Sequence, residues 1–176
     1  RIVQRSAGDR NPTLRASQVG ADATHPGALP TEPPMSHIAL DDTLRTGIEL
    51  IDDQHASLIE IYNLLDDAYH AGSANRNMGE ILARLLRYAQ MHFETEENLM
   101  RRFDYEGLEE HAAEHAELVD QLRRFVLRFT KKEERISTEM LAFVSNWITH
   151  HIQESDGRFA PMIREALQAD PEPADA

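Results

Sequence analysis

Apolar residues recur at steps of three and four along the middle of this chain, which is the spacing that gives an α-helix one buried face. Four stretches show the pattern, over residues 48–65, 81–99, 111–129 and 140–151. None of them alternates with the period of two that a half-buried β-strand requires. The pattern therefore predicts four amphipathic helices of about 20 residues each, and no sheet.

The connections between these predicted helices are short. They fall near residues 72–77, 103–107 and 131–135. Short loops make consecutive helices antiparallel neighbours. The predicted fold class is therefore all-α, an antiparallel up-down-up-down four-helix bundle.

Proline divides the chain into parts. Five of the eight prolines lie within the first 34 residues, and the next proline after Pro34 is Pro161. We expect residues 1–37 to be a linker or disordered N-terminal arm, residues 38–168 to be the folded domain, and residues 169–176 to be a disordered tail. The first residue is Arg1, which suits a processed protein and a fragment of a longer one equally.

Composition removes several classes of protein. The 176 residues, 41% of them hydrophobic, suffice for one globular domain with a single core. Cysteine is absent, which excludes disulfides, thiolate zinc sites and iron–sulfur clusters. A formal net charge of -13 argues against a nucleic-acid partner, which needs a basic surface. No apolar run approaches the ~18 residues of a membrane span, and we expect a cytoplasmic protein without membrane contact.

The predicted apolar faces also carry imidazoles and carboxylates. These residues are His55, His92, Glu96, His111, His115, His151 and Asp156. Residues four apart project side by side from a helix, so the HxxxE and HxxxH pairs can hold a common object. A single histidine on an apolar face is usually a hydrogen-bonded core residue. Seven such groups in one small core would each cost several kcal/mol without a partner, and a metal centre supplies that partner.

Asp156 has the least regular position in this set. It follows His151 by five residues, a rotation of ~500° along an ideal helix, which aims the two side chains in different directions. A π-like turn, or a distorted helix near Gly157, would bring Asp156 into the group. The alternative is a polar residue at a fraying helix end.

The types of donor limit the metal. Zinc prefers four ligands, and calcium and magnesium prefer oxygen alone. Imidazole with carboxylate suits iron, manganese or copper, and seven ligands are enough for two ions. If both carboxylates bridge, and one oxo or hydroxo group also bridges, two octahedral ions keep one open position. A small molecule such as dioxygen would bind there.

These motifs resemble the hemerythrins, and their bacterial branch in particular. The matching segments are GIELIDDQHASL at 47–58, HFETEENLM at 92–100, HAAEH at 111–115 and WITHHIQESD at 147–156. The sequence departs from the family at Leu40, where a tryptophan is usual, which affects packing of the arm and no ligand. His150 precedes His151, but only His151 is four residues from Trp147 and five from Asp156. His150, His70, His37 and His25 are therefore interpreted as surface or linker residues.

The resemblance implies a role for each motif residue. His111, His115 and His151 would hold one non-haem iron, and His55 and His92 a second iron with the open position. Glu96 and Asp156 would bridge the two ions, together with an oxo or hydroxo group. Leu58, Trp147 and Ile152 would line the oxygen pocket, although each can equally be plain core packing.

The function implied is reversible dioxygen binding rather than catalysis. The chain would act as a carrier or store, or as the oxygen-sensing domain of a signalling protein such as a chemotaxis receptor, with signalling domains upstream. One alternative is a di-iron oxidase or oxygenase of the ferritin-like kind. Those sites use Glu-x-x-His motifs and more glutamate, whereas this set is rich in histidine. A further alternative is a metal-free structural bundle.

Overall fold

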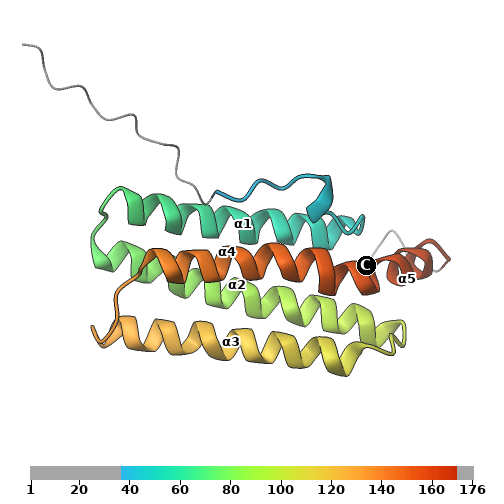
Figure 1. Ribbon diagram of the computed structural model, residues 1–176. Helices are drawn as coiled ribbons and strands as arrows, with labels where there is room; N and C mark the ends of the chain where they lie inside the picture. The colour runs from blue at the N-terminus through green and yellow to red at the C-terminus, as the bar shows by residue number, and fades with distance from the viewer. Residues whose placement is uncertain (1–36, 170–176) are drawn as a thin grey trace, which may run out of the picture. The chain divides into compact units, whose positions relative to one another are not determined.

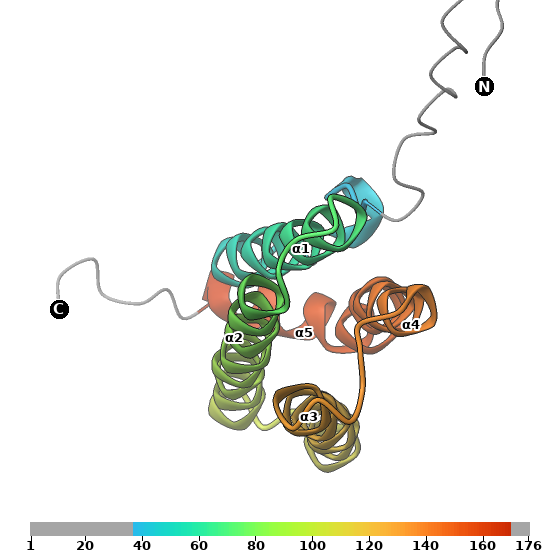
Figure 2. The same cartoon turned by 90° about the vertical axis from the view of Figure 1, so that its left-hand side faces the viewer.

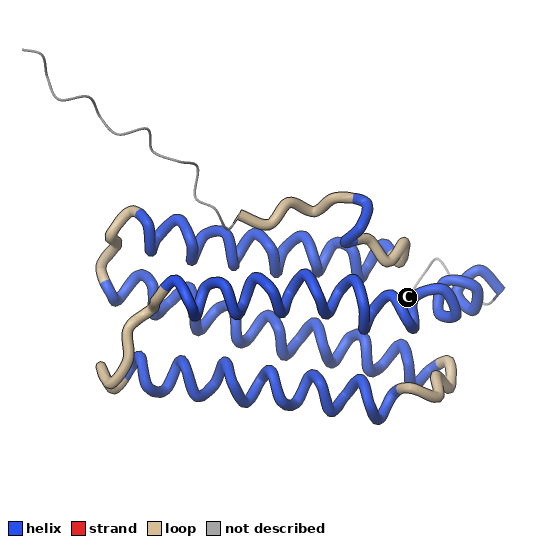
Figure 3. Tube along the Cα trace, viewed as in Figure 1, coloured by secondary structure: helices blue, strands red, loops and turns tan. Residues whose placement is uncertain are grey.

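The computed structural model describes residues 37–169, and all regular structure in this range is helical (Figure 3). The elements in chain order are the 3-10 helix η1 (Asp42–Leu44), α1 (Glu49–His70), α2 (Asn75–Arg102), α3 (Leu108–Thr130), α4 (Thr138–His150), the π-helix η2 (His151–Asp156) and α5 (Gly157–Ala169). The predicted arm, apart from His37, and the predicted tail, apart from Ala169, lie outside the described residues.

Helices α1 to α4 lie side by side and alternate in direction (Figure 1), and the view along the bundle places them at four corners (Figure 2). The predicted antiparallel four-helix bundle is therefore confirmed. Within residues 37–169, no helix is both long enough and apolar enough to cross a bilayer.

The fourth predicted helix is longer and less regular than its apolar pattern indicates. Helix α4 continues through η2 into α5 and ends at Ala169. The amide of Gly157 donates to the carbonyl of Ile152, five residues earlier, as in a π-turn. Pro161 lies inside α5, and its ring nitrogen has no hydrogen to donate to the carbonyl four residues before it. Within this long fourth helix, the irregular backbone thus lies between His151 and Pro161.

Helices α1, α2 and α3 end in the same way. The residue after each C-cap has a positive φ, 64° at Gly72, 52° at Asp104 and 61° at Lys132. The following amide then bonds back across the turn, as Ser73 N does to the carbonyl of Ala68 at 2.9 Å. This is a Schellman motif, in which glycine is the usual residue at the left-handed position. Only α1 has glycine there.

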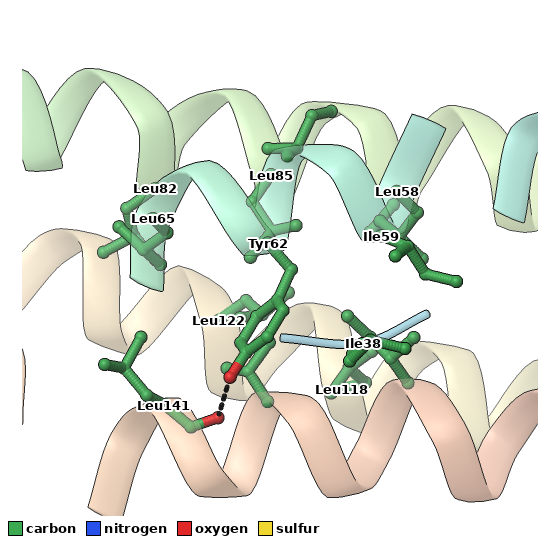
Figure 4. Close-up of a cluster of buried hydrophobic side chains, with 14 of the residues drawn as sticks. Ile38, Leu58, Ile59, Tyr62, Leu65, Leu82, Leu85, Leu118, Leu122 and Leu141 are labelled. Atoms are coloured by element: carbon green, nitrogen blue, oxygen red, sulfur yellow. Dashed lines mark hydrogen bonds between the residues drawn. The ribbon is translucent and has the colours of Figure 1, made fainter. Parts of the chain in front are cut away.

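The core consists of two apolar clusters. The larger one fills the bundle between the four helices and includes Leu65, Leu82 and Leu122 (Figure 4). Its one buried phenol belongs to Tyr62, whose hydroxyl donates to the carbonyl of Leu141 at 3.3 Å. The smaller cluster joins the start of α1, the end of α2 and α5, and is made of Ile48, Ile51, Met100, Phe159, Ala160 and Ile163.

The segment before α1 packs along the bundle. The side-chain amide of Asn63 makes two hydrogen bonds to the backbone of Ile38. Its Oδ1 accepts from Ile38 N and its Nδ2 donates to Ile38 O, both at 2.9 Å. Leu40, at the position where a tryptophan is usual, is half-buried against the larger cluster. A leucine therefore still makes apolar contact there.

The four histidines interpreted as surface or linker residues are distributed as follows. His37, His70 and His150 are exposed. Nε2 of His37 lies within hydrogen-bond distance of Oδ1 of Asp67, at 2.9 Å. His25 lies outside the described residues.

Candidate metal centre

The seven predicted metal-site residues meet in one layer inside the bundle. His55 comes from α1, His92 and Glu96 from α2, His111 and His115 from α3, and His151 and Asp156 from η2. All seven are buried, with exposed fractions of 4% or less. Along each helix this layer lies between residues of the two apolar clusters, as His55 does between Ile51 and Leu58. The layer therefore divides the hydrophobic core.

The π-helix accounts for the position of Asp156. A π-turn closes over five residues, so side chains five apart lie nearly above one another. In η2 this brings Oδ1 of Asp156 within 3.2 Å of Nε2 of His151. An ideal α-helix would point these two side chains apart.

Glu96 lies between two groups of imidazoles. Its Oε1 is 3.2 Å from Nε2 of His92 and 3.6 Å from Nε2 of His55. Its Oε2 is 3.1 Å from Nε2 of His115 and 3.5 Å from Nε2 of His111. Oε1 of Glu96 thus faces the α1 and α2 histidines, and Oε2 faces the two histidines of α3.

Asp156 repeats this arrangement from the opposite helix. Its Oδ2 is 3.2 Å from Nε2 of His55, and its Oδ1 is 3.5 Å from Nε2 of His111. The potential donor atoms form two compact groups, each within 4.8 Å, and both groups contain Glu96. The first joins Glu96 to His111, His115 and His151, and the second joins Glu96 to His55, His92 and Asp156. We call them the three-histidine half and the two-histidine half.

Several donor atoms in this layer have no hydrogen-bond partner among the described residues. They are both ring nitrogens of His55, Oε1 of Glu96 and both oxygens of Asp156. Some lie within ion-pair distance of one another, yet none is oriented as a hydrogen bond. Buried polar atoms without partners are costly. Two cations between the imidazoles and the carboxylates would satisfy them, so the residues fit a two-metal centre.

Burial keeps two of the imidazoles neutral. Desolvation lowers the pKa of His92 to about 4 and that of His151 to about 2, despite the nearby charge of Glu96. Both rings therefore carry a free lone pair near neutral pH, which is the form that binds a metal ion.

The charged groups of the layer are strongly linked. Burial and the charge of Glu96 raise the pKa of Asp156 to about 6. Burial opposes ionisation of Glu96 as well, but the four neighbouring imidazoles, His92 first, hold its pKa well below the usual range. Burial also disfavours a charged His55, yet Asp156 and Glu96 raise its pKa to about 9. A protonated His55 therefore places a positive charge beside both carboxylates, as a bound metal cation would.

Three histidines of the metal-site layer have a polar partner at Nδ1, the outer ring nitrogen, which points away from Glu96 and Asp156. Nδ1 of His92 lies 3.0 Å from Oε1 of Gln54, and Nδ1 of His115 lies 3.0 Å from Oε1 of Glu97. Nδ1 of His151 lies 3.6 Å from Oε2 of Glu114. Sequence reasoning missed Gln54, Glu97 and Glu114. The available signal was their position, because each directly precedes or follows a residue of the predicted metal site.

A small cavity lies one helical turn from the metal-site layer. Its volume is about 10 Å³, room for roughly one water-sized molecule. It is lined by Leu58, Leu85, Ala89, Leu118, Leu122, Val144, Trp147 and Ile148. Two of the three predicted pocket residues, Leu58 and Trp147, belong to this lining, whereas Ile152 is buried in the surrounding cluster. The Trp147 ring stacks on His151 with centroids 4.8 Å apart.

The family model described as the hemerythrin HHE cation binding domain matches residues 46–163, a range that includes the whole metal-site layer. The chain belongs to the hemerythrin family. The bacteriohemerythrin of Pseudomonas paraeruginosa is 30% identical over 133 residues, which cover 76% of this chain and 86% of that protein. The bacteriohemerythrin of Methylococcus capsulatus is 31% identical over 119 residues, 67% of this chain and 89% of that protein.

Solved hemerythrin structures agree with this assignment. The crystal structure of a wild-type hemerythrin superposes with a TM-score of 0.64 at 30% identity, and covers 67% of this chain and 90% of the other. A leucine-to-tyrosine variant of hemerythrin superposes with a TM-score of 0.69 at 28% identity, and covers 73% and 98%. Membership in a cation-binding family and the two compact groups of buried donor atoms make this layer the candidate metal centre.

Proposed function

We propose that this chain binds dioxygen reversibly at a non-haem di-iron centre. The observation that carries the proposal is the double orientation of Glu96 and Asp156. Each carboxylate turns one oxygen toward the two-histidine half and the other toward the three-histidine half. A pair of carboxylates in this arrangement suits two ions held side by side.

The distances in the layer support a role for each of its residues. His111, His115 and His151 would hold one iron, and His55 and His92 the other, while Glu96 and Asp156 bridge. Imidazole and carboxylate donors suit iron among other metals, and membership in the hemerythrin family supports iron as the one bound. Two bound irons would supply the redox chemistry for dioxygen binding, and the half with only two histidines would leave room for that ligand.

The protein around the centre supports binding rather than turnover. Of the eight described residues that line the cavity, none has an ionisable side chain. Leu58 and Trp147 therefore exclude water and offer no proton donor for further reduction of bound oxygen. Ile152, in η2, is buried in the apolar cluster that also contains Leu58. A di-iron oxidase would need a proton route to this space.

The biological role is either that of a carrier or store, or that of a sensing domain in a signalling protein. One contact favours the sensing role. The amide of Gln153, in η2 between His151 and Asp156, donates to Oγ1 of Thr43 at 3.0 Å. It joins the element that carries two proposed ligands to the segment that follows the arm. A change of geometry in η2 can therefore reach that segment.

Two measurements on the purified chain test the proposal. Iron analysis should give about two irons per chain, and a value near zero or one contradicts a di-iron centre. Air added to the reduced protein should produce a visible charge-transfer band that vacuum removes, and a protein that stays colourless contradicts oxygen binding. Continuous oxygen consumption in the presence of excess reductant would instead identify an oxidase.

A further inference from the structure

The two halves of the centre differ in what lies behind their imidazoles. In the three-histidine half, the outer nitrogens of His115 and His151 face the carboxylates of Glu97 and Glu114. In the two-histidine half, the outer nitrogen of His92 faces the neutral amide of Gln54. Among the residues that the structure describes, the outer nitrogen of His55 has no hydrogen-bond partner. Among the described residues, carboxylates therefore lie behind two imidazoles of the three-histidine half and behind neither imidazole of the two-histidine half, and the Glu114 carboxylate is also paired with Arg158.

These outer partners are held in place by neighbours. Glu114 accepts a short hydrogen bond from the hydroxyl of Ser155 and bonds to Nη2 of Arg158 at 2.9 Å. The amide nitrogen of Gln54 donates to Oγ1 of Thr95 at 3.3 Å, which turns its oxygen toward His92. The difference between the halves is therefore built into the packing of the helices.

A carboxylate behind a ligating histidine has a known physical effect. It fixes the ring and its tautomer and attracts the outer N–H proton, which makes the inner nitrogen a stronger electron donor to the metal. A neutral amide fixes the ring with much less charge. Stronger donation stabilises the more oxidised metal ion, and so lowers its reduction potential.

We propose that Glu97 and Glu114 are positioning residues that make the three-histidine half the electron-rich half of the centre, and that Gln54 keeps the two-histidine half electron-poor. This inference rests on the proposed di-iron centre. The half proposed to leave room for dioxygen would then be the weaker electron donor, and both carboxylates lie behind histidines of the other half. The charge of these side chains, and not only their shape, sets the difference.

The test measures the midpoint potential of the iron-loaded full chain in an optical cell, with small redox mediators as the one-electron donors. Glu97→Gln and Glu114→Gln keep an acceptor oxygen but remove the charge. Each should favour the reduced state by about tenfold, a rise of about 59 mV for a one-electron couple. Both variants should keep two irons per chain.

Two matched controls remove the same charge without touching a ligand. Glu94 lies in the same surface hollow as Glu97, and Glu117 lies in the same groove as Glu114. Among the described residues, no hydrogen bond or ion pair joins either side chain to a histidine of the centre. Glu94→Gln and Glu117→Gln should shift the potential much less. Equal shifts in test and control variants, at full iron content, would overturn the inference and leave the di-iron proposal intact.

The converse variant gives an independent result. Gln54→Glu places a carboxylate behind His92 and should lower the potential by a similar factor. If a glutamine variant loses iron, the potential of Gln54→Glu tests the inference instead. This change adds a negative charge behind His92 and keeps an oxygen that can accept its hydrogen bond. An unchanged or raised potential in Gln54→Glu refutes the role of charge. Fewer than two irons in the unaltered chain would overturn the di-iron proposal, and this inference with it.

Discussion

The interior around Tyr62, Leu65 and Leu82 is filled with hydrocarbon and aromatic side chains, and its one buried phenol is satisfied by a carbonyl (Figure 4). Ten residues beyond Leu82 on α2, the interior becomes imidazole and carboxylate, and several of these atoms have no hydrogen-bond partner within residues 37–169. One helix therefore buries two very different surfaces, an apolar region and a metal-site layer.

The apolar region and the metal-site layer differ in what stabilises them. Burial of apolar surface contributes about 25 cal/mol per Å², so the apolar region stabilises the fold without any ligand. Burial of charged groups opposes folding until a counter-charge is present. The free energy of metal binding is then also folding free energy for the second region. The apolar region should determine whether the bundle forms, and the metal-site layer how its stability depends on iron.

The largest effect is expected for Glu96→Ala. This change removes a carboxylate that lies between the two halves and the buried charge nearest to four imidazoles. Both irons should be lost, and the melting temperature of the iron-loaded protein should fall to that of the chelator-treated protein. Iron analysis and thermal unfolding followed by circular dichroism check this result.

An exposed acid on the same helix provides the control for Glu96→Ala. Glu94→Ala removes the same charge two residues away, where the side chain is exposed. It should retain two irons and the original melting temperature. If Glu96→Ala retained its iron, Glu96 would not be a bridging ligand.

A smaller effect of a different kind is expected for Leu82→Ala. Leu82 is fully buried in the apolar region, and truncation of such a leucine costs about 2 to 5 kcal/mol. Leu82 lies about 15 Å along α2 from His92, so iron content should remain at two per chain. Denaturant unfolding combined with iron analysis separates the two outcomes. Loss of iron in this variant would show that the two regions are not independent.

The bundle and the composition of its metal-site layer were predictable from the sequence for a simple reason. A helical period assigns each residue to a face, and imidazoles at i and i+4 on an apolar face are rare without a partner. Asp156 was the exception, because its spacing of five does not match that period. The π-helix resolves the mismatch, but the sequence offered a distorted turn only as one of two interpretations.

The outer partners were harder to predict, because nothing in a helical period separates them from solvated charges. Glu97 and Glu114 are partly exposed and follow or precede residues of the metal-site layer by one position. Their contacts depend on how adjacent helices are rotated against each other, which the pattern of one helix does not determine. The continuation of α4 into α5 was missed for a different reason: Gly157 and Pro161 indicate a break, whereas the helix runs through both residues.

The smallest expected effect lies outside both regions and tests the ends of the helices. Lys132 has φ 61° after α3, in the left-handed region where a side chain is disfavoured. Lys132→Gly should raise the free energy of unfolding by about 0.5 to 1 kcal/mol, because relief of strain exceeds the added entropy of the unfolded chain. Lys131, the preceding residue, has φ -74° and ψ -3°. Lys131→Gly relieves no strain and should destabilise the protein by a similar amount, so equal signs for the two variants in denaturant unfolding would contradict the role of backbone strain.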